Sequence, residues 1–241
     1  MNKILILGAL SALALGGCNK NADAPAKVAQ ASVKPPAGTS WTETTSLTPD
    51  GGMLMGNPAA PVKLLEFGAL SCPHCARFSR DSNEALKALI AKGTVSYELR
   101  TFLIHPQDVP ASLLARCNGA GPFFAIAEQM FATQDVWLGK SSTITPADQQ
   151  SWASMNPNQV AAAMADKLGL VEFVQQRGIP ADKAKACLAD PAGVKTLEKI
   201  SKSGTDDYKI SGTPTFIING QTVPNVTTWA DLEPLLKKAG A

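Results

Sequence analysis

The chain has 241 residues, of which 22 are Lys or Arg, 20 are Asp or Glu and only 2 are His. A net charge of +2 gives no electrostatic sign of nucleic-acid binding, and neither an internal repeat nor a glycine-rich phosphate loop is present. We therefore expect no nucleic-acid partner and no cofactor.

The first 17 residues predict a signal peptide. Lys3 precedes an apolar run at residues 4–15, which is too short to span a bilayer as a mature helix. Residues 15–18, Leu-Gly-Gly-Cys, resemble a bacterial lipobox, in which cleavage exposes the cysteine as a lipid-modified N-terminus. We expect Cys18 to anchor the protein to a membrane of the periplasm or cell envelope. An ordinary signal peptide with an incidental cysteine is the alternative.

Residues 18–46 predict a flexible tether, because they are rich in Ala, Pro, Lys, Ser and Thr and show no apolar periodicity. Trp41 has no explanation in this interpretation. Residues 47–241, about 195 in number, are enough for one sizeable core or for one domain that carries an insertion.

A Cys-x-x-Cys pair follows an apolar strand. Residues 62–70 are strand-like, residues 72–75 read Cys-Pro-His-Cys, and from residue 76 apolar side chains recur every three to four positions, as on an amphipathic helix. The thiols therefore lie at a helix N-terminus, where unpaired N–H groups and a partial positive charge favour a thiolate. Cys72 is better placed to ionise, and Cys75, one turn further, should face the interior.

Pro73 and His74 should tune the reactivity of the first cysteine. Pro73 lacks an N–H that would be unpaired in any case, and its fixed φ suits the first helical position. His74 adds a hydrogen-bond donor or a positive charge. The alternatives are half of a zinc site or a structural pair of cysteines that happen to be close. Zinc needs four ligands, but no second Cys-x-x-Cys exists, and the one other histidine, His105, stands alone. The sequence thus predicts a redox-active dithiol and no metal site, with His105 outside it.

The motif Cys72-Pro73-His74-Cys75, after a strand that carries Glu66, resembles the active site of the DsbA family of thiol:disulfide oxidoreductases. Residues 56–62 are similar to the segment that leads into this strand in a branch containing many bacterial envelope proteins. The likeness covers residues 47–241. It implies an α/β, thioredoxin-like fold with an inserted helical domain.

The remaining elements agree with that resemblance. Residues 94–102 predict a second strand, and about 105–203 predict a helical insertion with helix starts at 121–122, 156–157 and 190–191. Two strands follow at residues 215–223 around an Asn-Gly turn, and a last helix covers 229–238 after a Thr cap. The topology itself follows from the resemblance.

The resemblance also assigns residues outside the motif. It implies that Pro214 is cis and lies against the cysteines, with Thr213 presenting backbone groups to an extended substrate; a plain proline at a strand entry is the alternative. It gives Glu66 a role in proton transfer. Independently of the resemblance, an acid in an apolar strand is costly to bury unless it is paired or protonated. Lys63 and Arg100 are its possible partners, and a surface or ion-paired carboxylate is the alternative.

Two further cysteines, Cys117 and Cys187, fall in the expected insertion. If Cys18 carries lipid and Cys72 pairs with Cys75, these two are left, and an oxidising compartment favours a structural disulfide between them. Some DsbA-like proteins have a second disulfide in this domain. Two unrelated buried thiols are the alternative.

The sequence leads us to expect a lipid-anchored thiol:disulfide oxidoreductase, most readily an oxidase that introduces disulfides into exported proteins. By analogy with the family, a membrane quinone-linked partner would reoxidise it. A reductase or isomerase of the same fold is one alternative, which Thr213 favours. A metal-binding or chaperone lipoprotein that uses Cys72 and Cys75 as ligands is another.

Overall fold

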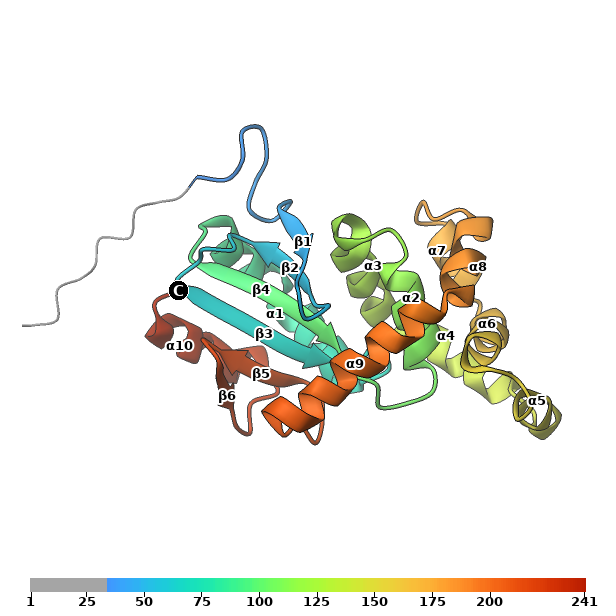
Figure 1. Ribbon diagram of the computed structural model, residues 1–241. Helices are drawn as coiled ribbons and strands as arrows, with labels where there is room; N and C mark the ends of the chain where they lie inside the picture. The colour runs from blue at the N-terminus through green and yellow to red at the C-terminus, as the bar shows by residue number, and fades with distance from the viewer. Residues whose placement is uncertain (1–33) are drawn as a thin grey trace, which may run out of the picture. The chain divides into compact units, whose positions relative to one another are not determined.

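The structure is a computed structural model that describes residues 34–241 (Figure 1). The expected signal peptide at 1–17, the lipid attachment at Cys18 and the first part of the tether lie outside these residues. Within 34–241, no helix is both long and apolar enough to cross a membrane.

A six-stranded sheet with the order β1-β2-β4-β3-β5-β6 forms the centre of the fold (Figure 1). Only β3 and β4 pair in parallel, and the other neighbours are antiparallel. The strands are β1 (Thr45–Leu47), β2 (Met53–Gly56), β3 (Val62–Gly68), β4 (Val95–Thr101), β5 (Thr215–Ile218) and β6 (Gln221–Val223). The expected thioredoxin-like α/β fold is confirmed, and the β1-β2 hairpin is an addition that the sequence did not predict.

The central strand β3 leads into the longest helix, α1 (Pro73–Ala91). Apart from Lys63, every residue of β3 is buried, as expected of a strand that is covered on both faces. Helix α1 returns along one face of the sheet to β4, and its buried side chains include Phe78, Leu86 and Ile90. The cysteine motif therefore lies where the most buried strand of the sheet ends.

Helices follow β4 as one long insertion, and a last helix follows β6. They are α2 (Asp108–Arg116), α3 (Ala120–Ala132), α4 (Gln134–Gly139), the short 3-10 helix η1 (Lys140–Thr143), α5 (Pro146–Trp152), α6 (Pro157–Leu168), α7 (Leu170–Gln175), α8 (Ala181–Ala189), α9 (Pro191–Tyr208) and α10 (Trp229–Ala239). Asn156, Asp190 and Thr228 cap their helices with side-chain oxygens that accept backbone N–H bonds.

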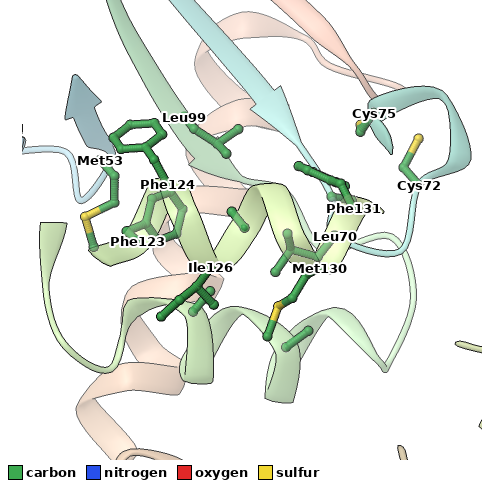
Figure 2. Close-up of a cluster of buried hydrophobic side chains, with 14 of the residues drawn as sticks. Met53, Leu70, Cys72, Cys75, Leu99, Phe123, Phe124, Ile126, Met130 and Phe131 are labelled. Carbon is green, nitrogen blue, oxygen red and sulfur yellow. The ribbon is translucent and has the colours of Figure 1, made fainter. Parts of the chain in front are cut away.

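Two helices of the insertion also pack on the sheet. Figure 2 shows side chains of α3, among them Phe124, against Met53 of β2 and Leu99 of β4. On the opposite face, α9 runs across the sheet and packs Ile200 against Phe67 of β3. The insertion is thus attached to both faces of the sheet. Its last helix continues to Tyr208, beyond the expected limit near residue 203.

A disulfide joins Cys117, directly after α2, to Cys187 in α8. The bond closes a loop with a sequence separation of 70. It fixes two helices of the insertion to each other and is separate from the cysteine motif on α1.

The structure corrects the expected end of the tether at residue 46. Trp41 is only 6% exposed, and its indole Nε1 would lie 2.8 Å from a Cβ placed on Gly93, so the ring fills the space beside that turn. Strand β1 begins at Thr45 and pairs with β2, which in turn pairs with β4. Residues 41–46 therefore belong to the folded domain.

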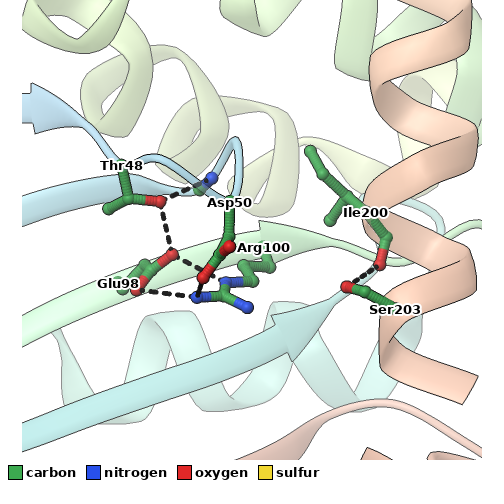
Figure 3. Close-up of polar contacts among 7 residues, drawn as sticks. Thr48, Asp50, Glu98, Arg100, Ile200 and Ser203 are labelled. Atoms are coloured by element: carbon green, nitrogen blue, oxygen red, sulfur yellow. Dashed lines mark hydrogen bonds and ion pairs between the residues drawn. The ribbon is translucent and has the colours of Figure 1, made fainter. Parts of the chain in front are cut away.

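Polar contacts join the loop between β1 and β2 to strand β4 (Figure 3). The Thr48 hydroxyl donates to Glu98 Oε1 (2.8 Å), and Arg100 donates to Asp50 (2.8 Å) and to Glu98 (2.7 Å). The Arg100 side chain is buried among these groups and over the ring of Phe67. The charge of Arg100 therefore stabilises the β1-β2 hairpin through its ion pairs with Asp50 and Glu98.

We predict that Trp41→Ala lowers the free energy of unfolding by about 3–5 kcal/mol, because it removes a buried indole and leaves a cavity. Urea denaturation would measure the change. Leu47→Ala serves as the control, since Leu47 is 61% exposed and its truncation should change stability by less than about 0.5 kcal/mol. A Trp41→Ala variant as stable as this control would restore the tether interpretation.

Candidate active site

The cysteine motif starts α1 immediately after the turn that follows β3. Cys72 is the N-cap residue, with φ −80° and ψ 121°, and Pro73 occupies the first helical position. Figure 2 shows the Cys72 and Cys75 side chains next to each other on this segment, near Leu70. Cys72 is 3% exposed and Cys75 is fully buried, and both are free thiols.

The two sulfurs have opposite acid-base properties. The pKa of Cys72 is lowered to about 5, against the effect of burial. The main cause is a hydrogen bond from the Cys75 thiol, and the Thr213 side chain and the backbone N–H groups of Cys75 and His74 contribute less. Burial and the hydrogen bond to Cys72 raise the pKa of Cys75 well above its usual range. At neutral pH the pair therefore holds one thiolate, on Cys72, and one proton, on Cys75.

His74 contributes through its main chain. Its side chain is exposed, and the group that lowers the pKa of Cys72 is its backbone N–H at the start of α1. The expected charge or donor from the imidazole is not among the causes of the shift. The sulfur is thus held by the helix N-terminus and by its partner cysteine.

The structure brings Thr213 and Pro214 to the cysteines from 141 residues away. The peptide bond between them is cis, and as a thiol Cys72 donates to the Thr213 carbonyl at 3.2 Å. An open hollow of about 400 Å³ extends from this turn between residues 208–215 and 222–227.

Glu66 lies in β3 and is 1% exposed, and its partner is Tyr97 of β4. The Tyr97 hydroxyl donates to Glu66 Oε2 at 2.7 Å. Neither expected partner contacts this carboxyl group, because Arg100 binds Glu98 and Asp50, and Lys63 donates to the Pro58 carbonyl.

The geometry of the strands explains this pairing. Side chains alternate between the faces of a strand, so Lys63, three residues from Glu66, must point to the other face. Glu66 pairs in register with Leu99, and Tyr97, two residues before Leu99, lies on the same face and within diagonal reach. Alternation alone would have excluded Lys63, but Tyr97 becomes visible only once the register is known.

Burial raises the pKa of Glu66 to about 8, the Tyr97 hydrogen bond opposes this increase, and the negative charge of Cys72 adds to it. The carboxyl group is therefore protonated at neutral pH when Cys72 is a thiolate. It also raises the pKa of Cys75, so it interacts electrostatically with both sulfurs. A buried acid in this position can give or take the proton that a change in the charge of the cysteines requires.

Two side chains of the insertion hold the turn before α1, and the sequence analysis missed both. Asp108, at the start of α2, accepts from the Ser71 amide (2.8 Å) and hydroxyl (2.9 Å). Gln134, at the start of α4, donates to the carbonyls of Leu70 (2.7 Å) and Cys72 (3.0 Å). The insertion thus fixes the backbone that positions the Cys72 sulfur. Nothing in the local sequence signals these contacts, which span more than 30 residues.

No group of three or more His, Cys, Asp or Glu side chains is placed to hold a metal ion in the described part of the chain, residues 34–241.

A family model described as thioredoxin matches residues 48–238. Among curated proteins, one from Rickettsia prowazekii, provisionally named a protein-disulfide oxidoreductase, is 28% identical over 185 residues, which are 76% of this chain and 60% of that protein. A Rickettsia felis protein of the same provisional name is 27% identical over 177 residues, 73% of this chain and 56% of that protein. The chain thus spans somewhat more than half the length of these relatives.

Solved structures extend the comparison. A crystal structure of a protein-disulfide isomerase from Novosphingobium aromaticivorans is 30% identical, covers 78% of this chain and 97% of that one, and superposes with a TM-score of 0.73. The alpha-DsbA1 protein of Wolbachia pipientis is 19% identical, with coverage of 80% and 92% and a TM-score of 0.63, and so shares the fold.

We predict that Glu66→Gln stabilises the protein more at pH 7 than at pH 4. The folded protein keeps the Glu66 proton up to about pH 8, whereas the unfolded chain releases it near pH 4.5, so wild-type stability falls as pH rises between these values. At about 1.4 kcal/mol per unit, the gain from Glu66→Gln should be about 3 kcal/mol larger at pH 7.

Urea denaturation of the reduced proteins at both pH values would measure this gain. Glu84→Gln, on the exposed side of α1, is the matched control and should change stability by less than about 0.5 kcal/mol at either pH. Equal effects of Glu66→Gln at pH 4 and pH 7 would mean that Glu66 is already ionised in the folded protein.

Proposed function

The chain belongs to the thioredoxin family and has the DsbA-like form of its fold, and from this premise we propose that it is a thiol:disulfide oxidoreductase with Cys72 as its reactive cysteine. The observation that carries the proposal is the asymmetry of the dithiol. One sulfur is stabilised as a thiolate at the N-terminus of α1 and next to a cis-proline turn, while its neighbour is buried and protonated. This arrangement suits thiol-disulfide exchange.

In the oxidised protein, a substrate thiolate attacks Cys72 Sγ, the Cys72–Cys75 bond breaks, and the electron pair leaves on Cys75. Glu66 gives Cys75 the proton that its high pKa demands. The second substrate thiolate then attacks the substrate sulfur of the mixed disulfide, and Cys72 leaves as a stable thiolate. Thr213 and Pro214 receive the substrate as an extended segment, since their turn adjoins both Cys72 and the open hollow.

The stability of the reduced form supports the oxidase direction of the reaction. A Cys72 pKa of about 5 stabilises the thiolate at pH 7 by roughly 3 kcal/mol, which for a two-electron couple raises the reduction potential by about 60 mV. The chain therefore acts as an oxidase that introduces disulfides into exported proteins with free thiols. Lipidation of Cys18 would anchor it in the periplasm or cell envelope, where a membrane quinone-linked partner reoxidises it.

Disulfide isomerisation is the second candidate. It is favoured by the similarity to the Novosphingobium aromaticivorans protein, which is named a protein-disulfide isomerase. In that case reduced Cys72 would attack a wrong disulfide of a client, and another thiol of the client would then displace Cys72 as the correct disulfide forms.

We predict that the oxidised full-length chain converts a reduced peptide with two thiols to its disulfide, and that Cys72→Ser abolishes this reaction. Cys75→Ser has no disulfide to transfer and should also be inactive with this peptide. With a disulfide-containing peptide, its Cys72 thiolate should form a mixed disulfide that persists, because Cys75 can no longer displace the peptide. Mass spectrometry of acid-quenched mixtures would measure how much peptide disulfide and mixed disulfide has formed. The matched control is the double variant Cys117→Ser/Cys187→Ser, which removes the other cysteine pair and should keep the activity.

Equilibration with a glutathione series would place the chain relative to thioredoxin, whose potential is about −270 mV. A value clearly above that, with little repair of scrambled clients, is expected of the oxidase. Efficient repair of scrambled clients would move the assignment to the isomerase, and equal activity of wild type and Cys72→Ser would overturn both.

A further inference from the structure

Three polar side chains next to the proposed dithiol form a connected series of hydrogen bonds. Asp108 is fully buried and accepts from the amide and the hydroxyl of Ser71, at 2.8 and 2.9 Å. The same Ser71 oxygen lies 2.8 Å from Nδ1 of His105. The series therefore includes Ser71, the residue that directly precedes Cys72 in the turn before α1.

The positions of the protons follow from the bonding partners. Asp108 also accepts from the amides of Ile104 (3.0 Å) and His105 (2.9 Å), so four donors converge on its two oxygens. A carboxylate only accepts, and the Ser71 hydroxyl must therefore donate its proton to Asp108. The Ser71 oxygen is then left to accept from Nδ1–H of His105. This fixes the tautomer of the imidazole and leaves the lone pair on Nε2.

Nε2 of His105 is available at the edge of the sheet where the reaction takes place. The histidine is exposed, in contrast to Ser71 and Asp108, and its Nε2 has no hydrogen bond within residues 34–241. It lies on the connection from β4 to α2, and Cys72 follows β3. Because β3 and β4 are parallel, their carboxyl ends share one edge, at which substrates approach folds of this kind.

We propose that His105 is the general base that deprotonates the attacking thiol of the substrate, with Ser71 and Asp108 as positioning residues. This inference rests on the proposed function. The proton of the substrate S–H moves to Nε2, and the electron pair left on sulfur forms the bond to Cys72 Sγ. The Cys72–Cys75 bond breaks, Cys75 is reduced, and His105 later releases its proton to water. The substrate sulfur is oxidised in the same step.

A base is useful here because an ordinary thiol has a pKa of about 8.5, so at pH 6.5 only about 1% of it is ionised. A general base can thus accelerate the attack of the thiol by at most about 100-fold at this pH, and the acceleration disappears once the thiol is ionised in solution. Ionisable groups near His105 include Asp108 at the start of α2, Cys72 and His74 at the start of α1, and Glu198 on α9, which lines a cavity together with Pro106.

The test compares wild type with His105→Asn in the oxidised full-length chain. The asparagine amide can take the place of Nδ1–H and keep the bond to Ser71, but it offers no base at the position of Nε2. We expect reduction by a peptide thiol to be at least tenfold slower at pH 6.5 and within twofold of wild type at pH 9. With 5-thio-2-nitrobenzoate, which is already ionised at both pH values, the two proteins should react equally. Stopped-flow measurements would give the rates.

Ser71→Ala is the second variant, since it keeps His105 but removes the group that orients it. It should show a smaller loss with the same pH dependence. An equal loss for His105→Asn with both thiols and at both pH values would indicate a structural role and overturn the inference, as would no loss at all. A wild type that reacts with neither thiol would overturn the proposed function, and this inference with it.

Discussion

The hydrogen bond from the Cys75 thiol to the Cys72 sulfur is the interaction on which the site depends. A helix N-terminus alone supplies about 0.3–1 kcal/mol, or about 2 in sheltered positions, whereas one pKa unit corresponds to about 1.4 kcal/mol. The dipole therefore accounts for about one unit, and a pKa near 5 for Cys72 requires direct donors as well. The Cys75 thiol is the strongest of these donors to Cys72, because its burial raises its pKa and keeps it protonated.

The fold assembles this pair from distant parts of the chain. Strand β3 delivers the motif at the end of a buried strand, and the turn before β5 brings Thr213 and Pro214 to Cys72. The helical insertion adds two clamps, since Asp108 and Gln134 hold the turn between β3 and α1 from separate helices. Because α3 and α9 of the insertion also pack on opposite faces of the sheet, these clamps are fixed relative to the sulfurs.

The sequence predicted what local pattern and family resemblance carry: the motif at a helix start, the helix caps and the thioredoxin-like fold with its insertion. It did not predict what depends on register and long-range contact. Trp41 appeared to lie in a tether because its neighbours are polar and β1 has only three residues. Tyr97 was missed because its pairing with Glu66 depends on the β3-β4 register. The contact between His105 and Ser71 was not predicted because the two residues are 34 positions apart.

The most direct test of this account is a pH titration of the reduced wild-type chain, followed by thiolate absorbance near 240 nm. The account predicts that one thiolate per molecule appears with a midpoint near pH 5, and that Cys75→Ala moves this midpoint upward. A midpoint close to that of a free cysteine, about 8.5, would contradict the claim that Cys75 and the start of α1 stabilise the Cys72 thiolate.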